Sequence, residues 1–326
     1  MRLLFITSTR IGDAVLSTGL LDHQLRSHPE ARVTIACGPV SAPLFEAVPG
    51  VEEVLVVRKR PFDLHWLALW SRVATRRWDL IVDLRASMVG LFVPHRRRIA
   101  GRRKDQQVHR VVELGELVDL EPPPSPRIWT GPAHEAAADR LIPAAGPVLA
   151  VGPAANWPGK QWPAERFAAL ITRLTSPAGI LPGARVAVVA AGHERQQAEP
   201  VIESLGSERV IDLVGRVSLP EAAACLTRAA LFVGNDSGLM HLAAAAGTPT
   251  LGLFGPSRDA RYAPWGDHCG VVRTLESDEA LRALPDFDRR AAEGSLMDSL
   301  TVESVAEAAE ALWARGLSSR PAHVAK

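Results

Sequence analysis

The sequence predicts an α/β protein made of two Rossmann-like domains that face a cleft. Apolar runs with the length of buried strands alternate with stretches of helical periodicity, which is typical of parallel βαβ units. This pattern stops at the proline-rich segment 121–126, which can continue neither a helix nor a central strand, and then starts again. The chain of 326 residues is long enough for two domains, each with its own core.

The expected strands are short apolar runs bounded by polar or glycine-containing loops. They cover residues 2–7, 33–37, 54–57, 80–83, 148–151, 186–190, 210–213, 230–233 and 250–254. The expected helices have apolar residues at helical spacing, and they cover residues 14–26, 163–174, 237–246 and 301–315. We therefore expect an N-terminal domain over residues 1–145, a C-terminal domain over 146–310 and a C-terminal tail over 311–326.

The composition narrows the function classes. The net charge is +1, so the chain as a whole has no electrostatic preference for nucleic acid or for a membrane surface. Three cysteines far apart in the sequence fit neither a disulfide framework nor a zinc site, and they are typical of a reducing compartment. No signal peptide and no apolar run of ~20 residues is evident, which predicts a cytoplasmic protein. The sequence also lacks the motifs of serine hydrolases, P-loop enzymes, zinc proteases and NAD-binding enzymes.

Two loops contain the residues expected of a diphosphate site. The first, residues 234–237, follows a buried strand and leads into an Ala-rich helix whose free N–H groups would attract phosphate. Asp236 either caps this helix or hydrogen-bonds sugar hydroxyls. The second, residues 152–162, contains Lys160, a cation suited to a diphosphate. The plainer alternatives, a capped helix packed closely on a sheet and a solvated lysine, stay open at this point.

Two acidic residues stand near the ends of other expected strands. Asp13 follows the first strand at the start of a helix, whose dipole favours the ionised carboxylate and so suits a general base. The alternative is that Asp13 only caps the helix. Glu194 follows the expected strand 186–190 and is a candidate to accept hydrogen bonds from ribose or sugar hydroxyls.

Two further segments carry weaker signals. The basic run between residues 95 and 110 is either a solvated face or a surface for an anionic acceptor or membrane. Its basic residues are Arg96, Arg97, Arg98, Arg102, Arg103, Lys104 and Arg110. The Trp-rich segment 62–70 is expected to be a buried helix rather than one that faces a membrane.

Taken together, these loops resemble glycosyltransferase family 9, the bacterial heptosyltransferases of lipopolysaccharide core synthesis. The resemblance covers about residues 1–315 and rests on five motifs in the family's order. They are Ile11-Gly-Asp-Ala-Val-Leu16, Trp157-Pro-Gly-Lys-Gln-Trp-Pro-Ala-Glu-Arg-Phe167, Gly234-Asn-Asp-Ser-Gly-Leu-Met-His-Leu-Ala243, Leu253-Phe-Gly-Pro256 with Trp265-Gly266, and Met297-Asp-Ser-Leu-Thr-Val-Glu-Ser-Val305. The family's usual Gly followed by Ser or Thr before the lysine is replaced here by Ala154, Ala155 and Asn156.

The resemblance implies a GT-B fold whose N-terminal domain binds the acceptor and whose C-terminal domain binds a nucleotide sugar, usually ADP-heptose. The last helix is expected to cross back to the N-terminal domain. The implied reaction is an inverting transfer of heptose to a lipopolysaccharide inner-core acceptor, either lipid A–Kdo or a heptose. It requires no metal and no cofactor. The implied location is the cytoplasm, with peripheral contact to the cytoplasmic face of the inner membrane.

The resemblance also implies roles for individual residues. Asp13 would be the general base, and Lys160 would stabilise the leaving diphosphate. The further donor-binding candidates are Asn156, Glu194, Asp236, Ser237, Gly238 and His241. The weaker acceptor-binding candidates are Arg10, Arg96, Arg97 and Arg98.

Three alternatives stay open. The protein could be a family member that uses another nucleotide sugar or acceptor, a nucleotide-sugar-binding paralogue without activity, or an epimerase of related architecture. The presence of both Asp13 and Lys160 argues against the inactive paralogue. The order of the motifs argues against the epimerase.

Overall fold

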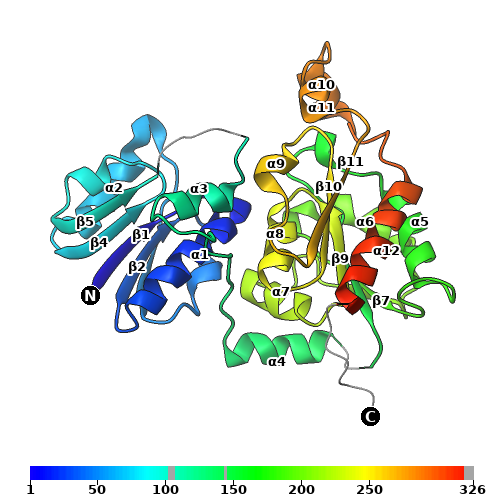
Figure 1. Cartoon of the computed structure of the whole chain (residues 1–326), viewed down its shortest axis with the longest axis horizontal. Coiled ribbons are helices and arrows are strands. Elements are labelled where there is room, and N and C mark those ends of the chain that lie inside the picture. The colour runs from blue at the N-terminus through cyan, green and yellow to red at the C-terminus, as the bar shows by residue number, and fades with distance from the viewer. Residues whose placement is uncertain (102–106, 143–144, 319–326) are drawn as a thin grey trace. The chain divides into compact units, whose positions relative to one another are not determined.

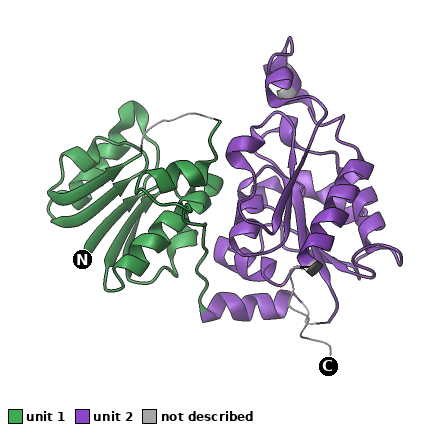
Figure 2. Ribbon diagram, in the orientation of Figure 1, with its two compact units in different colours: residues 1–131 green, residues 132–326 purple. Residues whose placement is uncertain are grey.

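The computed structural model describes residues 1–101, 107–142 and 145–318. The chain forms two compact units, residues 1–131 (unit 1) and 132–326 (unit 2), which have different colours in Figure 2. Each unit has a parallel sheet of its own with helices packed against it, as Figure 1 shows. The expected α/β class is therefore confirmed for each unit separately.

Unit 1 contains a five-stranded parallel sheet in the order β3-β2-β1-β4-β5. Its strands are β1 (Arg2–Ile6), β2 (Arg32–Cys37), β3 (Val51–Val56), β4 (Trp78–Asp83) and β5 (His95–Ala100), and its helices are α1 (Ile11–Ser27), α2 (Leu64–Val73) and α3 (Arg110–Glu116). From β1 the chain adds β2 and β3 on one side, and then β4 and β5 on the other. This reversal point, between β1 and β4, is where such sheets bind ligands at the carboxyl ends of their strands.

Unit 2 contains a six-stranded parallel sheet in the order β11-β10-β9-β6-β7-β8. Its strands are β6 (Val148–Gly152), β7 (Arg185–Val188), β8 (Val210–Asp212), β9 (Leu231–Asn235), β10 (Thr250–Phe254) and β11 (Cys269–Arg273). Its helices are α4 (Pro132–Leu141), α5 (Ala164–Thr175), α6 (Arg195–Glu203), α7 (Leu219–Leu226), α8 (Gly238–Ala245), α9 (Asp259–Tyr262), α10 (Asp278–Arg282), α11 (Phe287–Glu293) and α12 (Val302–Ser318). Here the strand order reverses between β6 and β9.

The core of unit 2 includes the last helix of the chain. Strands β6 and β9 are buried at every position, as parallel strands covered on both faces require. Helix α12 packs against α5 and β11, and it buries Val305, Ala309 and Leu312 in the same core. The last helix therefore packs on the sheet of unit 2, whereas we expected it to cross back to the N-terminal domain. The expected tail boundary at residue 311 falls inside this helix.

The two units divide at residues 131 and 132, whereas we expected a boundary at 145 and 146. The difference is helix α4, which packs on α7. Arg228, just after α7, pairs with Glu135 (2.9 Å) and Asp139 (2.6 Å) of α4. These ion pairs attach α4 to unit 2. Proline occurs near both the expected and the observed boundary, so the sequence did not distinguish them.

All nine expected strands are present, and the described part of the chain contains two more that the sequence analysis did not predict. The additional strands, β5 and β11, each form an edge of their sheet. Strand β5 contains three consecutive arginines, and its first three residues are exposed. Charged residues are common on edge strands because they discourage pairing with another chain. Part of the basic run is therefore an edge strand.

Helix α2 is amphipathic, so the expectation of a buried helix is wrong for one of its sides. Leu69 and Val73 are buried, whereas Leu64, Leu67 and Trp70 are 49%, 59% and 38% exposed. Among the helices of the described residues, none is both long enough and apolar enough to span a membrane.

Gly19 allows the segment that leads out of unit 1 to cross helix α1. A Cβ at position 19 would lie 2.2 Å from the carbonyl oxygen of Pro124 and 2.6 Å from that of Ser125. The crossing is fixed by Arg127, whose backbone N–H donates to Oγ1 of Thr18 at 2.9 Å. Any side chain at position 19 would force the two backbones apart.

Candidate active site

An ion pair joins the two loops at the reversal point of the unit 2 sheet. Lys160 follows β6, and its Nζ donates to Oδ2 of Asp236, which follows β9, at 2.5 Å. The two side chains are 17% and 7% exposed. The structure therefore brings together two residues that were selected from separate loops of the sequence.

Asn235 holds the Lys160 loop at both of its ends. The side chain is fully buried. Its Oδ1 accepts from the backbone N–H of Trp162 (3.1 Å), and its Nδ2 donates to the carbonyl of Pro153 (2.7 Å). A carboxamide suits this position because one atom must accept while the other donates. The sequence analysis did not select Asn235, and its only signal was that the chain has just two asparagines.

The turn before α12 supports the same loop. The backbone N–H of Leu296 donates to the carbonyl of Gly159 at 3.1 Å. The indole N–H of Trp162 donates to the carbonyl of Leu300 at 2.8 Å. The family motif over residues 297–305 thus contributes to the frame that positions Lys160.

The start of helix α8 offers hydrogen-bond donors beside Asp236. Ser237 is extended, and its side chain does not cap the helix. The buried Oγ of Ser237 has no hydrogen-bond partner among the described residues. This hydroxyl and the backbone N–H groups that begin at Gly238 are suited to bind an anion. His241, which is 4% exposed, lies one turn further along α8.

Asn156 and Glu194 are placed less directly for donor binding. Asn156 is exposed on the loop after β6, and the neighbouring Ala155 donates its backbone N–H to Oε1 of Gln197 at 3.0 Å. Glu194 is half-buried after β7, and its Oε2 accepts the backbone N–H of Ala191 at 2.9 Å. The carboxylate of Glu194 therefore already stabilises its own turn, with lone pairs left for a further donor.

A second buried hydroxyl follows β10, the neighbour of β9. Ser257 is 3% exposed, and its Oγ finds no hydrogen-bond partner in the part of the chain that is described. Arg273 of β11 fixes this loop through the carbonyl of Gly255 (3.2 Å) and through Asp259 (2.6 Å). An unsatisfied buried hydroxyl costs about 1–3 kcal/mol, so Ser257 is a further candidate to bind a ligand. The sequence analysis used this loop only as a family motif.

In unit 1, Asp13 lies in the first turn of α1, directly after the reversal point of the sheet. The N-cap residue of α1 is Arg10, so Asp13 does not occupy the capping position that the alternative reading gave it. Its carboxylate is half-buried, and it forms no hydrogen bond or ion pair with the described residues of unit 1. A carboxylate in this state can accept a proton from a bound hydroxyl.

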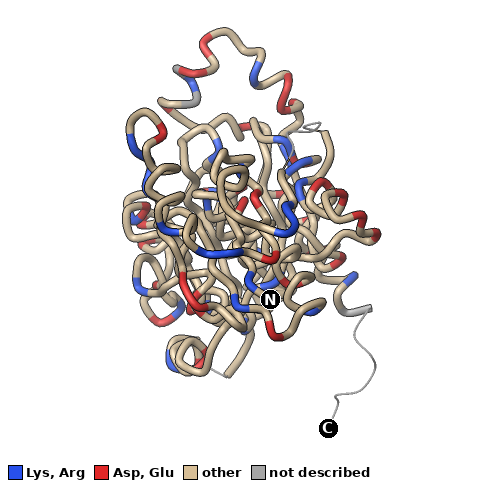
Figure 3. The backbone as a smooth tube through the Cα atoms, turned by 90° about the vertical axis from the view of Figure 1, so that its left-hand side faces the viewer, with Lys and Arg blue, Asp and Glu red and all other residues tan. Residues whose placement is uncertain are grey.

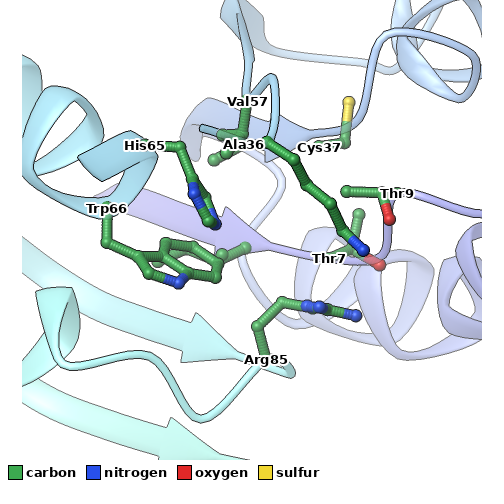
Figure 4. Close-up of a pocket in the computed structure, with 10 residues that line it drawn as sticks. Thr7, Thr9, Ala36, Cys37, Val57, His65, Trp66 and Arg85 are labelled. Carbon is green, nitrogen blue, oxygen red and sulfur yellow. The ribbon is translucent and has the colours of Figure 1, made fainter. Parts of the chain in front are cut away.

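A pocket lies at the carboxyl ends of the unit 1 strands, and two cationic side chains line it. Thr7 and Thr9 follow β1, Cys37 ends β2 and Arg85 follows β4, and Figure 4 shows these side chains around the pocket. Lys59 also lines it. Two cations and two hydroxyls form a set of donors for an anionic group. The sequence analysis did not select these two cations.

Burial raises the pKa of all three cysteine thiols. Burial raises the pKa of the Cys37 thiol to about 11, against a weaker lowering effect of a hydrogen bond with Ser41. Burial likewise raises the pKa of Cys225 to about 11 and that of Cys269 to about 12. All three thiols therefore stay protonated near neutral pH. Among the described residues, no group of three or more His, Cys, Asp or Glu side chains is arranged to hold a metal ion.

The arginines suggested for the acceptor lie at different edges of the unit 1 sheet. Arg10 is exposed at the start of α1, at the carboxyl edge. Arg96 and Arg97 lie in the amino-terminal half of β5. Arg98 donates to Oδ2 of the fully buried Asp83 at 3.1 Å, which gives it a structural role. The further basic candidates Arg102, Arg103 and Lys104 lie outside the described residues.

Two doubly wound α/β units in one chain, one of them with hydrogen-bond donors suited to an anion at its reversal point, are the architecture of the GT-B fold. The solved glycosyltransferase family 9 structure from Veillonella parvula is similar, with 21% identity, a TM-score of 0.78, and coverage of 96% of this chain and 97% of that chain. The Escherichia coli heptosyltransferase WaaC with ADP has 19% identity, a TM-score of 0.71, and coverage of 96% and 100%. The expected GT-B type of fold is confirmed.

The sequence comparisons give the family. Residues 69–292 match the family model for glycosyltransferase family 9 (heptosyltransferase). The lipooligosaccharide heptosyltransferase 2 of Haemophilus influenzae is 24% identical over 316 residues, which cover 85% of this chain and 90% of that protein. The chain belongs to glycosyltransferase family 9, and the resemblance inferred from its motifs is confirmed.

Proposed function

We propose that this enzyme transfers a heptose from ADP-heptose to a hydroxyl of a lipopolysaccharide inner-core acceptor. The family membership and the names of the relatives support the heptose and the acceptor. The observation that carries the proposal is the Lys160–Asp236 pair beside the start of α8, because this arrangement suits a nucleoside diphosphate.

The donor half of the mechanism belongs to unit 2. Lys160 and the N–H groups from Gly238 onward face the diphosphate and stabilise the negative charge that grows on it as the sugar leaves. The hydroxyl of Ser237 adds a neutral donor. Asp236, already close to Lys160, accepts from a hydroxyl of the donor sugar, with His241 near the phosphates and Glu194 near the nucleoside.

The acceptor half belongs to unit 1. The Asp13 carboxylate takes the proton of the acceptor hydroxyl, whose oxygen forms the new bond to the anomeric carbon. The bond between that carbon and the diphosphate oxygen breaks, and its electron pair leaves with ADP. A single displacement of this kind inverts the anomeric configuration. Lys160 and the helix N-terminus supply the positive charge at the leaving group, so we propose that the reaction does not depend on a metal.

The acceptor is a lipid-linked, anionic saccharide. Arg10 and the pocket with Lys59 and Arg85 stand at the carboxyl edge of unit 1 and suit its acidic groups. We propose that Arg96 and Arg97 have at most a secondary role, because they lie in the other half of their strand. The enzyme then acts at the cytoplasmic face of the inner membrane as a peripheral membrane protein.

The first test is calorimetric titration of ADP, GDP, UDP and ADP-heptose into the purified protein. We expect ADP and ADP-heptose to bind at least ten-fold more tightly than the other two. A preference for another nucleotide would keep the fold and the mechanism and change the donor. If none of the four binds, the diphosphate site is wrong.

The second test is the transfer reaction itself. We expect transfer of heptose to an inner-core acceptor to continue in excess chelator, and NMR of the product to show the inverted anomeric configuration. Loss of activity in chelator that a divalent metal restores would contradict the metal-independent mechanism. A product that retains the configuration would contradict the single displacement.

A further inference from the structure

Most of the exposed large apolar side chains lie in one short stretch of unit 1. Ten such side chains are exposed among the described residues, and seven of them fall between residues 62 and 92. We call these seven the apolar patch: Phe62, Leu64, Leu67, Trp70, Met88, Leu91 and Phe92.

The patch is built from two segments that contact each other, helix α2 and the turn after β4. Leu64 and Leu67 are three residues apart on α2 and so lie on the same side of the helix. The α2 helix contacts the turn over residues 89–91. The indole N–H of Trp70 donates to the carbonyl of Phe92 at 2.9 Å, which ties the two segments together.

The side chain of Phe62 is exposed, and its backbone conformation is strained. The side chain is 95% exposed. Phe62 and the next residue, Asp63, both have a φ of 54°, in the left-handed region that non-glycine residues avoid. Backbone strain of this kind clusters at functional sites, and here it coincides with a group of exposed apolar side chains.

Positive charge is concentrated in the same segment of the chain, even though Arg72 and Arg76 both pair with Glu53 and Arg98 pairs with Asp83. Residues 58–98 contain ten Lys and Arg and three Asp and Glu, although the whole chain has a net charge of only +1. Figure 3 shows Lys and Arg as well as Asp and Glu along the backbone, and the sequence count shows that this segment has an excess of positive residues. Arg58 and Arg60, next to Phe62, are exposed and have no ion-pair partner among the described residues.

We propose that the apolar patch docks into the interfacial region of a bilayer that contains anionic lipids. Aromatic and leucine side chains enter the headgroup–acyl boundary, and neighbouring arginines bind the phosphates above it. The charge argues against a second copy of this chain on the patch, because a symmetric dimer would press two cationic rims together.

This inference deepens the proposed membrane contact and rests on the proposed function for its biological role. It adds the surface and the lipid chemistry. Docking through α2 and the turn after β4 would leave the unit 2 residues proposed for ADP unchanged. Lipid binding and ADP binding can therefore be measured separately.

The test is co-sedimentation of the full-length protein with vesicles of phosphatidylcholine, with and without phosphatidylglycerol. We expect binding to the phosphatidylglycerol vesicles that weakens with salt. The variant Phe62→Ser/Leu67→Ser should bind them at least ten-fold more weakly, and so should Arg58→Ser/Arg60→Ser. The matched control is Leu275→Ser, an exposed leucine (90%) outside the patch, which should bind like the wild type. Circular dichroism and ADP titration check that each variant is folded.

Three results would overturn the proposal. The wild type could fail to bind either vesicle, or Phe62→Ser/Leu67→Ser could bind as tightly as the wild type. Light scattering could also reveal a dimer that this double variant dissociates, in which case a second copy covers the patch. Vesicle binding without any ADP binding would instead count against the proposed function and leave the docking surface standing.

Discussion

Replacing Lys160 with alanine separates its structural contact from its proposed role at the diphosphate. The Nζ of Lys160 pairs with Asp236 at 2.5 Å, and the Asp236 side chain is only 7% exposed. The variant leaves this buried carboxylate without its partner, which costs about 3–5 kcal/mol of stability. For a unit of this size that lowers Tm by about 2–4 °C for each kcal/mol.

Lys160→Ala should also weaken the binding of the donor nucleotide, and this effect is separate from the loss of stability. A hydrogen bond to a charged group contributes about 1.5–3 kcal/mol, which corresponds to a ~10- to 150-fold weaker Kd for ADP. We expect calorimetry at 25 °C, where the variant is still folded, to show a loss in this range. Lys59→Ala is the matched control, because Lys59 lines the unit 1 pocket and should leave the Kd for ADP unchanged.

The Asp236→Asn variant should change the affinity for ADP in the opposite direction from Lys160→Ala, or leave it unchanged. It also breaks the ion pair, but it removes a negative charge near the diphosphate, so ADP should bind as tightly as to the wild type or more tightly. Transfer should still fall, because the carboxylate no longer accepts from the donor sugar. If Lys160→Ala lowers Tm yet keeps the Kd for ADP within two-fold of the wild type, Lys160 serves only the ion pair and our reasoning is refuted.

Four further variants or measurements test other features. Asp13→Asn should lower kcat by about 10²–10⁴-fold with ADP binding unchanged, and wild-type turnover would rule out Asp13 as the base. Asn235→Ala should cost about 2–4 kcal/mol in chemical denaturation, since it leaves two buried backbone groups unsatisfied, and a smaller loss would contradict the role of Asn235 in holding the Lys160 loop. Gly19→Ala should cost about 1–3 kcal/mol because its Cβ would meet the Pro124 carbonyl at 2.2 Å; an unchanged Tm would contradict the crossing. The raised pKa of Cys37, about 11, predicts slow reaction with thiol reagents at pH 8 and a stability contribution that is present below about pH 9 and lost as pH rises toward 11.

The central strands could be predicted from the sequence because burial determines their composition. Strands β6 and β9 are covered on both faces, so they read as continuous apolar runs. The loops that follow them were selected because parallel strands place their carboxyl ends at one edge. The pairing of Lys160 with Asp236 follows from the reversal of strand order between β6 and β9, and single-sequence periodicity does not reveal that order.

The remaining features depend on contacts between distant residues. The edge strands β5 and β11 lack the apolar signal because each has a neighbour on one side only. Asn235 acts on groups 73 and 82 residues away in the sequence, so nothing local marks it as a clamp. The exposure of Leu67 and Trp70 was not predicted because an apolar helix is most often buried, and composition does not show which side lacks a partner.

The division at residue 131 separates the residues proposed to bind the donor from those proposed to act on the acceptor. The residues proposed to recognise the donor are all encoded after it, and the proposed base and the cationic pocket are encoded before it. With the proposed roles, a recombination at this junction would exchange the residues that recognise the acceptor and keep those that bind the leaving group. Substitutions in the first half of the gene could then change the acceptor without changing the residues that bind the nucleotide sugar.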